Sequence, residues 1–153
     1  MFKSLFLIPI FIFLLQCEND SVSEDCSAVT CYVETLHLQL IDQNSNENLL
    51  ENDTYIQDDI AITDNNSNAI PFSIVSSSFG QAIQILLTST RTELLNYTFT
   101  IKNKTTFNST ISIEKTGEGN FCCGIKKEVT SITVTGIENE INLSKKTIMV
   151  FLE

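Results

Sequence analysis

Residues 32–41 read YVETLHLQLI, and apolar and polar side chains alternate along this stretch. In an extended chain Leu36, Leu38 and Leu40 therefore share one face, while His37 and Gln39 share the other. This alternation predicts a strand with one buried face. Residues 42–48, DQNSNEN, follow directly and are rich in side chains that bond their own backbone, so they predict a turn that ends the strand.

Seven further segments carry a similar strand signal. They are short, rich in Ile, Thr and Phe, and separated by turn-forming residues. No window beyond the first 17 residues has a helical stripe, although residues 92–95 could form a single helical turn. The chain is therefore predicted to be all-β, with a single antiparallel β-sandwich of about seven or eight strands over residues 31–153. The expected further strands are residues 59–63, 70–75, 81–88, 96–102, 107–114, 128–135 and 147–152.

Four of the five cysteines are expected to form disulfides. The fifth, Cys17, belongs to a leader described below that predicts export, and an even set of cysteines in an exported chain is typical of crosslinks. The four are Cys26, Cys31, Cys122 and Cys123. A bond between the adjacent Cys122 and Cys123 is disfavoured by geometry. Two crosslinks from Cys26 and Cys31 to Cys122 and Cys123 remain, and the sequence leaves both ways of pairing them open. Zinc is disfavoured because the spacing is not that of a zinc knuckle, and no metal or cofactor is expected.

The chain begins with MFKSLFLIPIFIFLLQC, in which Lys3 precedes an apolar run over residues 5–15. This run is shorter than the roughly 20 residues that span a bilayer, and it is typical of a secretory signal. Residues 14–17, LLQC, resemble a bacterial lipobox, in which the cysteine is acylated and becomes the new N-terminus; Gln16 stands where that family usually has Gly, Ala or Ser. The resemblance implies a lipoprotein signal peptide over residues 1–16 and a lipidated Cys17. An ordinary secreted protein and an uncleaved anchor are the alternatives.

Residues 18–30, ENDSVSEDCSAVT, carry four carboxylates and no aromatic side chain. Such a segment cannot bury enough apolar surface to order itself, so residues 17–30 are predicted to be a flexible acidic tether. An acidic stretch behind the anchoring cysteine resembles the surface-export signal of small Bacteroidetes lipoproteins. We therefore expect a protein that is lipid-anchored in the outer membrane, on its periplasmic face or on the cell surface.

The domain itself also carries a resemblance. Ile41, Asp42, Glu47 and Leu49 are spaced as in the first hairpin of prealbumin-like, carboxypeptidase-regulatory-like Ig sandwiches, with Asn46 where Gly is usual and Asn48 where Pro is usual. Together with the lipobox, the stretches CSAVTC (26–31), ENLL (47–50) and FCCG (121–124) make the chain similar to small Bacteroidetes lipoproteins. This resemblance implies an architecture and no activity.

The charge distribution disfavours nucleic acid as a partner. The chain has a formal net charge of −10, and residues 4–90 contain twelve Asp and Glu but no Lys or Arg. Affinity for phosphate backbones comes from clustered Lys and Arg, which this half of the chain does not have. We expect the membrane, through the lipid anchor, and an unidentified protein or glycan as partners.

Two runs repeat the alternate-residue spacing of calcium loops. A loop of the EF-hand type needs Gly at its sixth position and Glu at its twelfth, and neither run provides them. Ordinary Asx turns are therefore the favoured interpretation. The runs are Asp42, Asn44, Asn46 and Asp64, Asn66, Asn68.

No catalytic motif is present, and the single histidine, His37, is expected to be a surface residue. The leading hypothesis is a non-catalytic interaction or structural module of the cell envelope. The alternative is a calcium- or glycan-binding module that uses the turn of residues 42–53 and nearby Tyr55. Tyr32 could also serve as an exposed aromatic platform for a glycan, whereas Tyr97 shares the core face of its strand. A hydrolase is a third hypothesis, and it requires a cleft that brings His37 to carboxylates.

Overall fold

The structure is a computed structural model, and it describes residues 26–28, 31, 33–87, 93–102, 105–116, 122–124 and 126–153. The predicted signal peptide, Cys17 and Tyr32 lie outside the described residues. Of the predicted tether, only Cys26–Ala28 is described, and it forms one 3₁₀ turn, η1. Within the described part of the chain, no helix has the length and apolar character needed to cross a membrane.

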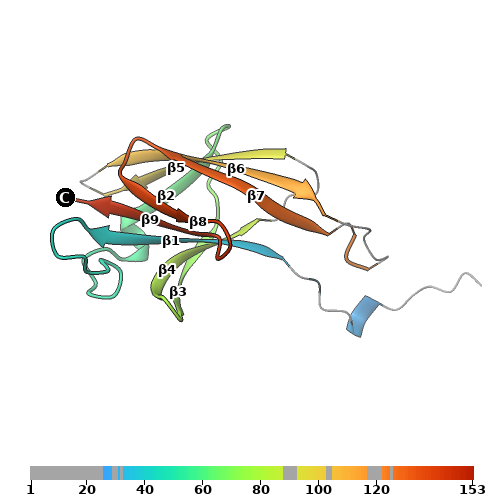
Figure 1. The fold of residues 1–153 in the computed structure, drawn as a ribbon, viewed down its shortest axis with the longest axis horizontal. Helices are drawn as coiled ribbons and strands as arrows, with labels where there is room; N and C mark the ends of the chain where they lie inside the picture. Colours follow the sequence, from blue (N-terminus) through green and yellow to red (C-terminus); the bar gives the residue numbers. More distant parts are fainter. Residues whose placement is uncertain are drawn as a thin grey trace, which may run out of the picture.

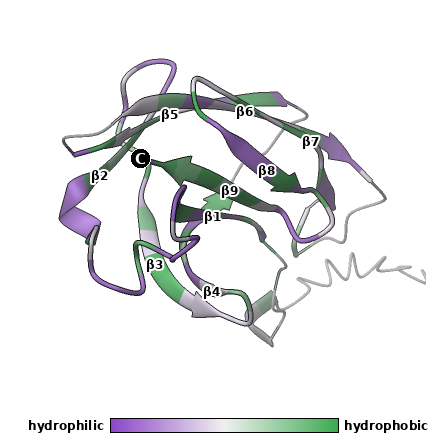
Figure 2. Ribbon diagram, turned by 60° about the vertical axis from the view of Figure 1, so that its left-hand side comes forward, coloured by the Kyte–Doolittle hydropathy of each residue, from purple (hydrophilic) through white to green (hydrophobic). Residues whose placement is uncertain are grey.

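Two β-sheets lie face to face as the two layers of a sandwich, which confirms the predicted all-β fold (Figures 1 and 2). Sheet A has the strand order β3-β4-β1-β9-β8, and sheet B has the order β2-β5-β6-β7. The short 3₁₀ turn η2 (Gln57–Asp59) precedes β2, and Figure 2 shows it as hydrophilic. The strands are β1 (Glu34–Asp42), β2 (Ile60–Asp64), β3 (Phe72–Ser77), β4 (Gly80–Leu87), β5 (Glu93–Ile101), β6 (Thr106–Lys115), β7 (Lys127–Thr135), β8 (Asn139–Asn142) and β9 (Thr147–Leu152).

The predicted alternation decides which side chains form the core. Leu36, Leu38 and Leu40 on β1 are fully buried, as expected for the inner face of the central strand of sheet A. Opposite them, Phe99 on β5 stacks on Phe107 on β6 with ring centroids 4.9 Å apart. Burying such side chains is the main favourable term that holds the two sheets together, at about 1.5–3 kcal/mol for each large apolar side chain.

Three details differ from the prediction. A ninth strand, β8, forms the edge of sheet A next to β9. The central strands β1 and β9 pair in parallel, with Leu38 opposite Ile148, so sheet A is mixed and not wholly antiparallel. Residues 93–95 belong to β5 and make no helical turn, because their backbones pair with residues 111–113 of β6.

Two disulfides fasten the N-terminal segment to the connection between β6 and β7. Cys26 pairs with Cys122 and Cys31 with Cys123, which confirms the expected crosslinks and settles the pairing that the sequence left open. The two Cα–Cα distances are 5.3 Å. Figure 1 shows η1 and the start of β1 at one end of the sandwich, with the C-terminus and the loop after β1 at the opposite end.

A buried ion pair reinforces the same end of β1. Glu34, only 6% exposed, sits opposite Leu87 of β4 and pairs with the ammonium of Lys146, just before β9. The backbone of Lys146 is left-handed, with φ of 51°, and its carbonyl accepts a hydrogen bond from the backbone N–H of His37 at 2.9 Å. The side chain and the backbone of Lys146 therefore both hold the turn before β9 against β1.

Candidate functional site

A cleft of about 590 Å³ opens on the outer face of sheet A, at the end of β1 remote from the disulfides. The floor is formed by Gln39 and Ile41 of β1 and Met149 of β9. Alternation points these side chains outward, on the face of the sheet away from the buried Leu38, Leu40 and Ile148. The loop after β1 and the β3–β4 hairpin supply the walls. The full lining is Gln39, Ile41, Asn46, Glu47, Asn48, Glu51, Asn52, Phe79 and Met149.

The loop wall is shaped by the turn formers that the sequence analysis identified. Asp42 Oδ1 accepts hydrogen bonds from the backbone N–H groups of Asn44 (2.9 Å) and Ser45 (2.7 Å), which is an Asx turn. Asn46 follows with φ of 59°, a left-handed conformation that asparagine tolerates. The buried Leu49 and Leu50 then anchor the loop in the core.

Three hydrogen bonds hold the hairpin wall, two to the loop wall and one to the floor. Gln81 donates its backbone N–H to Glu51 Oε1 at 3.0 Å, and its carbonyl accepts from Asn48 Nδ2 at 2.8 Å. The Phe79 carbonyl accepts from Gln39 Nε2 at 2.7 Å. Gly80 makes this close approach feasible: its φ is 103°, and a Cβ there would collide with Glu51 Oε1.

Gln39 is the one deeply buried polar side chain of the floor, with 5% of its surface exposed. Its amide N–H₂ is committed to the Phe79 carbonyl, so the other amide atom is the acceptor Oε1. Among the described residues no group donates a hydrogen bond to Oε1. The floor therefore presents an oriented acceptor beside the apolar surfaces of Ile41, Met149 and Phe79.

His37 lies beside the cleft without lining it. Its ring meets Phe79 edge-on with centroids 5.6 Å apart, and its Nε2 lies 3.2 Å from Gln84 Nε2. Partial burial lowers the pKa of His37 below its usual 6.5. In the described part of the chain no carboxylate is hydrogen-bonded to His37, so the structure does not bring together the His37–carboxylate constellation that a hydrolase requires.

The two runs with calcium-loop spacing are Asx turns, as the favoured interpretation had it. Asp64 Oδ1 accepts from the backbone N–H groups of Asn66 and Asn68, each at 2.8 Å, and Oδ2 accepts from the Asn68 amide at 2.9 Å. These hydrogen bonds lower the pKa of Asp64. Among the described residues no group of three or more His, Cys, Asp and Glu side chains is placed to hold a metal ion.

Tyr55 does not form the exposed platform that the glycan-binding alternative requires. It is 8% exposed, its backbone N–H donates to the Leu49 carbonyl at 3.0 Å, and burial followed by the charge of Asp59 raises its pKa. Tyr97 is buried as expected. The apolar surfaces of the cleft come from Phe79, Ile41 and Met149 instead, for which the alternation of single segments gave no functional signal.

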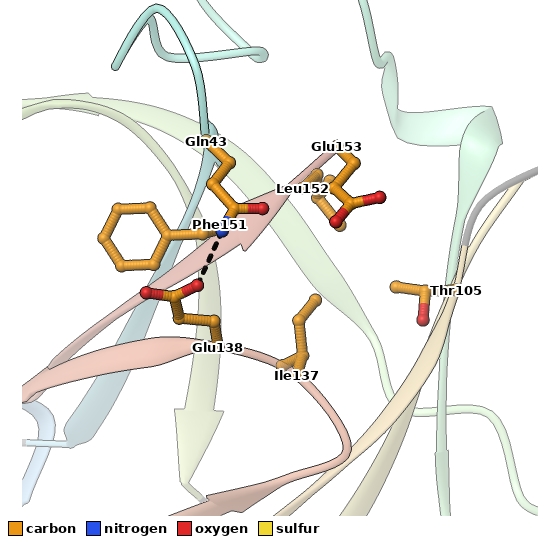
Figure 3. Close-up of a pocket in the computed structure, with 7 residues that line it drawn as sticks. All are labelled: Gln43, Thr105, Ile137, Glu138, Phe151, Leu152 and Glu153. Carbon is orange, nitrogen blue, oxygen red and sulfur yellow. Dashed lines mark hydrogen bonds between the residues drawn. The ribbon is translucent and has the colours of Figure 1, made fainter.

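A second hollow, of about 420 Å³, lies at the same end of the sandwich (Figure 3). Figure 3 shows the Gln43 side chain directed at Glu138, whose carboxylate accepts its hydrogen bond at 2.7 Å, and Phe151 directed away from Leu152. Phe151 is the register partner of Ile41, so the two hollows are neighbours. The amide of Gln43 is already paired with a carboxylate, and the cleft is the better-equipped site. The lining is Gln43, Thr105, Ile137, Glu138, Phe151, Leu152 and Glu153.

Comparisons with known proteins give no family for this chain. No protein-family model matches the sequence, and neither a curated protein nor a solved structure matches it. The function must therefore be inferred from the geometry of the chain itself.

Proposed function

We propose that this protein is an exported, lipid-anchored β-sandwich that serves as a non-catalytic binding module of the cell envelope. The observation that carries the proposal is the pair of disulfides between the segment 26–31 and Cys122–Cys123. Disulfides persist in oxidising compartments and are rare in the cytosol, so they indicate an extracytoplasmic location. The lipobox-like residues 14–17 add the anchor, since acylation at Cys17 would attach the chain to a membrane.

The fold suits display from an anchor at Cys17. Cys17 lies nine positions before Cys26, and nine residues reach about 30 Å at full extension. The disulfides fix Cys26 and Cys31 at one end of the sandwich, while the loop after β1, which forms one wall of the cleft, lies at the other (Figure 1). A tethered domain of this kind would hold its closed, crosslinked end toward the membrane and offer the cleft to the surrounding space.

The chemistry of the cleft supports binding over catalysis. Its polar lining consists of amides and the two carboxylates Glu47 and Glu51, and Glu51 is committed to the Gln81 N–H. The described lining contains no Ser, Cys or His that could act as a nucleophile or a paired base. Apolar surface with a few oriented polar groups is typical of small-molecule binding sites.

Metabolic labelling with an alkyne analogue of palmitate tests the anchor. Wild-type protein should take up the label and sediment with membranes, whereas Cys17→Ala should be unlabelled. The matched control is Gln16→Gly, which restores the small residue usual in a lipobox and should be labelled at least as well as wild type. Equal labelling of wild type and Cys17→Ala would refute the anchor.

A further inference from the structure

We propose that the cleft between the loop of residues 46–52 and the β3–β4 hairpin is a carbohydrate-binding site that takes an uncharged oligosaccharide. The inference goes beyond the proposed anchoring and does not depend on it, because the cleft is formed by the folded domain alone. It rests on three features: an oriented acceptor at the floor, apolar surfaces beside it, and the charge of the lining.

The oriented acceptor is Gln39 Oε1. Gln39 is only 5% exposed, and its amide orientation is fixed because only Nε2 can donate to the Phe79 carbonyl. Among the described residues, Oε1 is not one of the buried atoms without a partner, so it faces the solvent of the cleft, and a ligand that displaces this water must donate a hydrogen bond in its place. The cleft therefore selects a molecule that places a hydroxyl or N–H donor at its floor, which is what the equatorial hydroxyls of a sugar ring provide.

The surfaces around this acceptor match a sugar ring as well. Ile41, Met149 and Phe79 offer apolar contact for the C–H faces of the ring, and Asn46, Asn52 and Glu47 stand at the rim for its hydroxyls. The cleft volume of about 590 Å³ lies in the range of about 300–1,000 Å³ that small-molecule sites occupy. The pattern of apolar faces with polar edges in one site is therefore the complement of a saccharide.

Charge narrows the class of ligand. The described lining carries the carboxylates Glu47 and Glu51 and no Lys or Arg, so phosphorylated, sulfated and uronic-acid sugars are repelled. A calcium ion is disfavoured, because Glu51 Oε1 already accepts the Gln81 N–H and only two carboxylates line the cleft. Hydroxyl groups are good donors to the carboxylate of Glu47, so a neutral glycan remains.

The test is calorimetry on the full-length protein in micelles of a sugar-free zwitterionic detergent. The probes are cellotetraose, maltotetraose, xylotetraose, mannotetraose and chitotetraose. Calcium chloride and spermidine are titrated separately as charged control ligands. At least one tetrasaccharide should bind with Kd below about 1 mM, the upper end for a specific weak site. Acylation plays no part in this measurement, so its failure and the failure of the anchor are distinguishable.

The variants locate the binding. Gln39→Leu, which keeps the size of the side chain but loses its amide, should weaken binding about tenfold or more. Gln43→Leu, the matched change in the neighbouring hollow, should bind as wild type does. The Glu47 side chain makes no hydrogen bond within the described structure, so Glu47→Ala should weaken sugar binding without affecting folding. This variant still tests the proposal if Gln39→Leu unfolds. No heat with any of the five sugars, heat with calcium or spermidine alone, or unchanged affinity in both cleft variants would overturn the proposal.

Discussion

Removing one of the two disulfides should lower the free energy of unfolding by less than half as much as removing both. The bonds lie close together: Cys26 and Cys31 are five positions apart, and their partners Cys122 and Cys123 are adjacent. Once either bond is present, the other closes only a small ring made of residues 26–31 and 122–123. The test replaces the cysteines of one disulfide with Ser, then those of the other, and finally all four.

The magnitudes follow from the lengths of the closed loops. A single bond spanning 92 or 96 positions restricts the unfolded chain by about 4.7 kcal/mol in the chain-entropy estimate. The second bond closes a ring of about eight residues, for which the same estimate gives about 2.5 kcal/mol. Each single removal should therefore destabilise by about 2.5 kcal/mol and the double removal by about 7 kcal/mol. The double removal exceeds the two single removals combined by about 2 kcal/mol.

Urea unfolding followed by circular dichroism measures these differences on proteins that all carry Cys17→Ser. With a slope of about 1–3 kcal/mol per molar urea, each single removal should shift the midpoint by about 0.8–2.5 M. Cys31 is exposed, so the Ser replacement there removes little packing. The reasoning would be refuted if each single removal cost about 4.7 kcal/mol and the double removal equalled their sum. That result would mean that the two bonds constrain the unfolded chain independently.

Three further substitutions test contacts within the fold. Gly80→Ala should destabilise by about 1–2 kcal/mol in urea unfolding, since φ is 103° and the new Cβ meets Glu51 Oε1; an unchanged midpoint would show that the hairpin is not confined there. Burial lowers the folded-state pKa of His37, so the unfolded chain binds the extra proton and stability should fall as the pH drops below about 6.5. His37→Gln should flatten the stability curve between pH 5 and 7.5, and an identical curve would contradict this. Lys146→Met should destabilise by about 2–4 kcal/mol, because Glu34 is left buried and unpaired; thermal unfolding equal to wild type would exclude a stabilising role for the pair.

The strands could be predicted where alternation is strong. Residues 147–152 were predicted with the bounds of β9, and the inward Leu36, Leu38 and Leu40 define the core face of β1. Strand β8 reads NEIN, and as a short, polar edge strand it has too few buried positions to alternate. The extension of β5 into residues 93–95 could not be predicted from alternation either, because the apolar Leu94 is exposed. Backbone pairing with β6, and not burial, makes these residues part of the strand.

The direction of pairing and the cleft could not be predicted for a common reason. Periodicity reports which face of a strand is buried, but not which strand lies beside it. The parallel partners Leu38 and Ile148 are 110 positions apart. The turn formers after Asp42 indicated one wall of the cleft, whereas Phe79 and Met149 join it only through folding. Tyr55 was misassigned for the same reason, since nothing local shows that its loop turns inward.

The central claim is that a lipid anchor at Cys17 holds a sandwich closed by two disulfides. The most direct test is the intact mass of the protein, purified from the membranes of the cells that make it. The predicted mass is that of residues 17–153 plus the acylated lipid at Cys17, less the four hydrogens of two disulfides. Reduction should then add those four hydrogens and leave the lipid in place. A mass that retains residues 1–16, lacks the lipid or is unchanged by reduction would contradict the account.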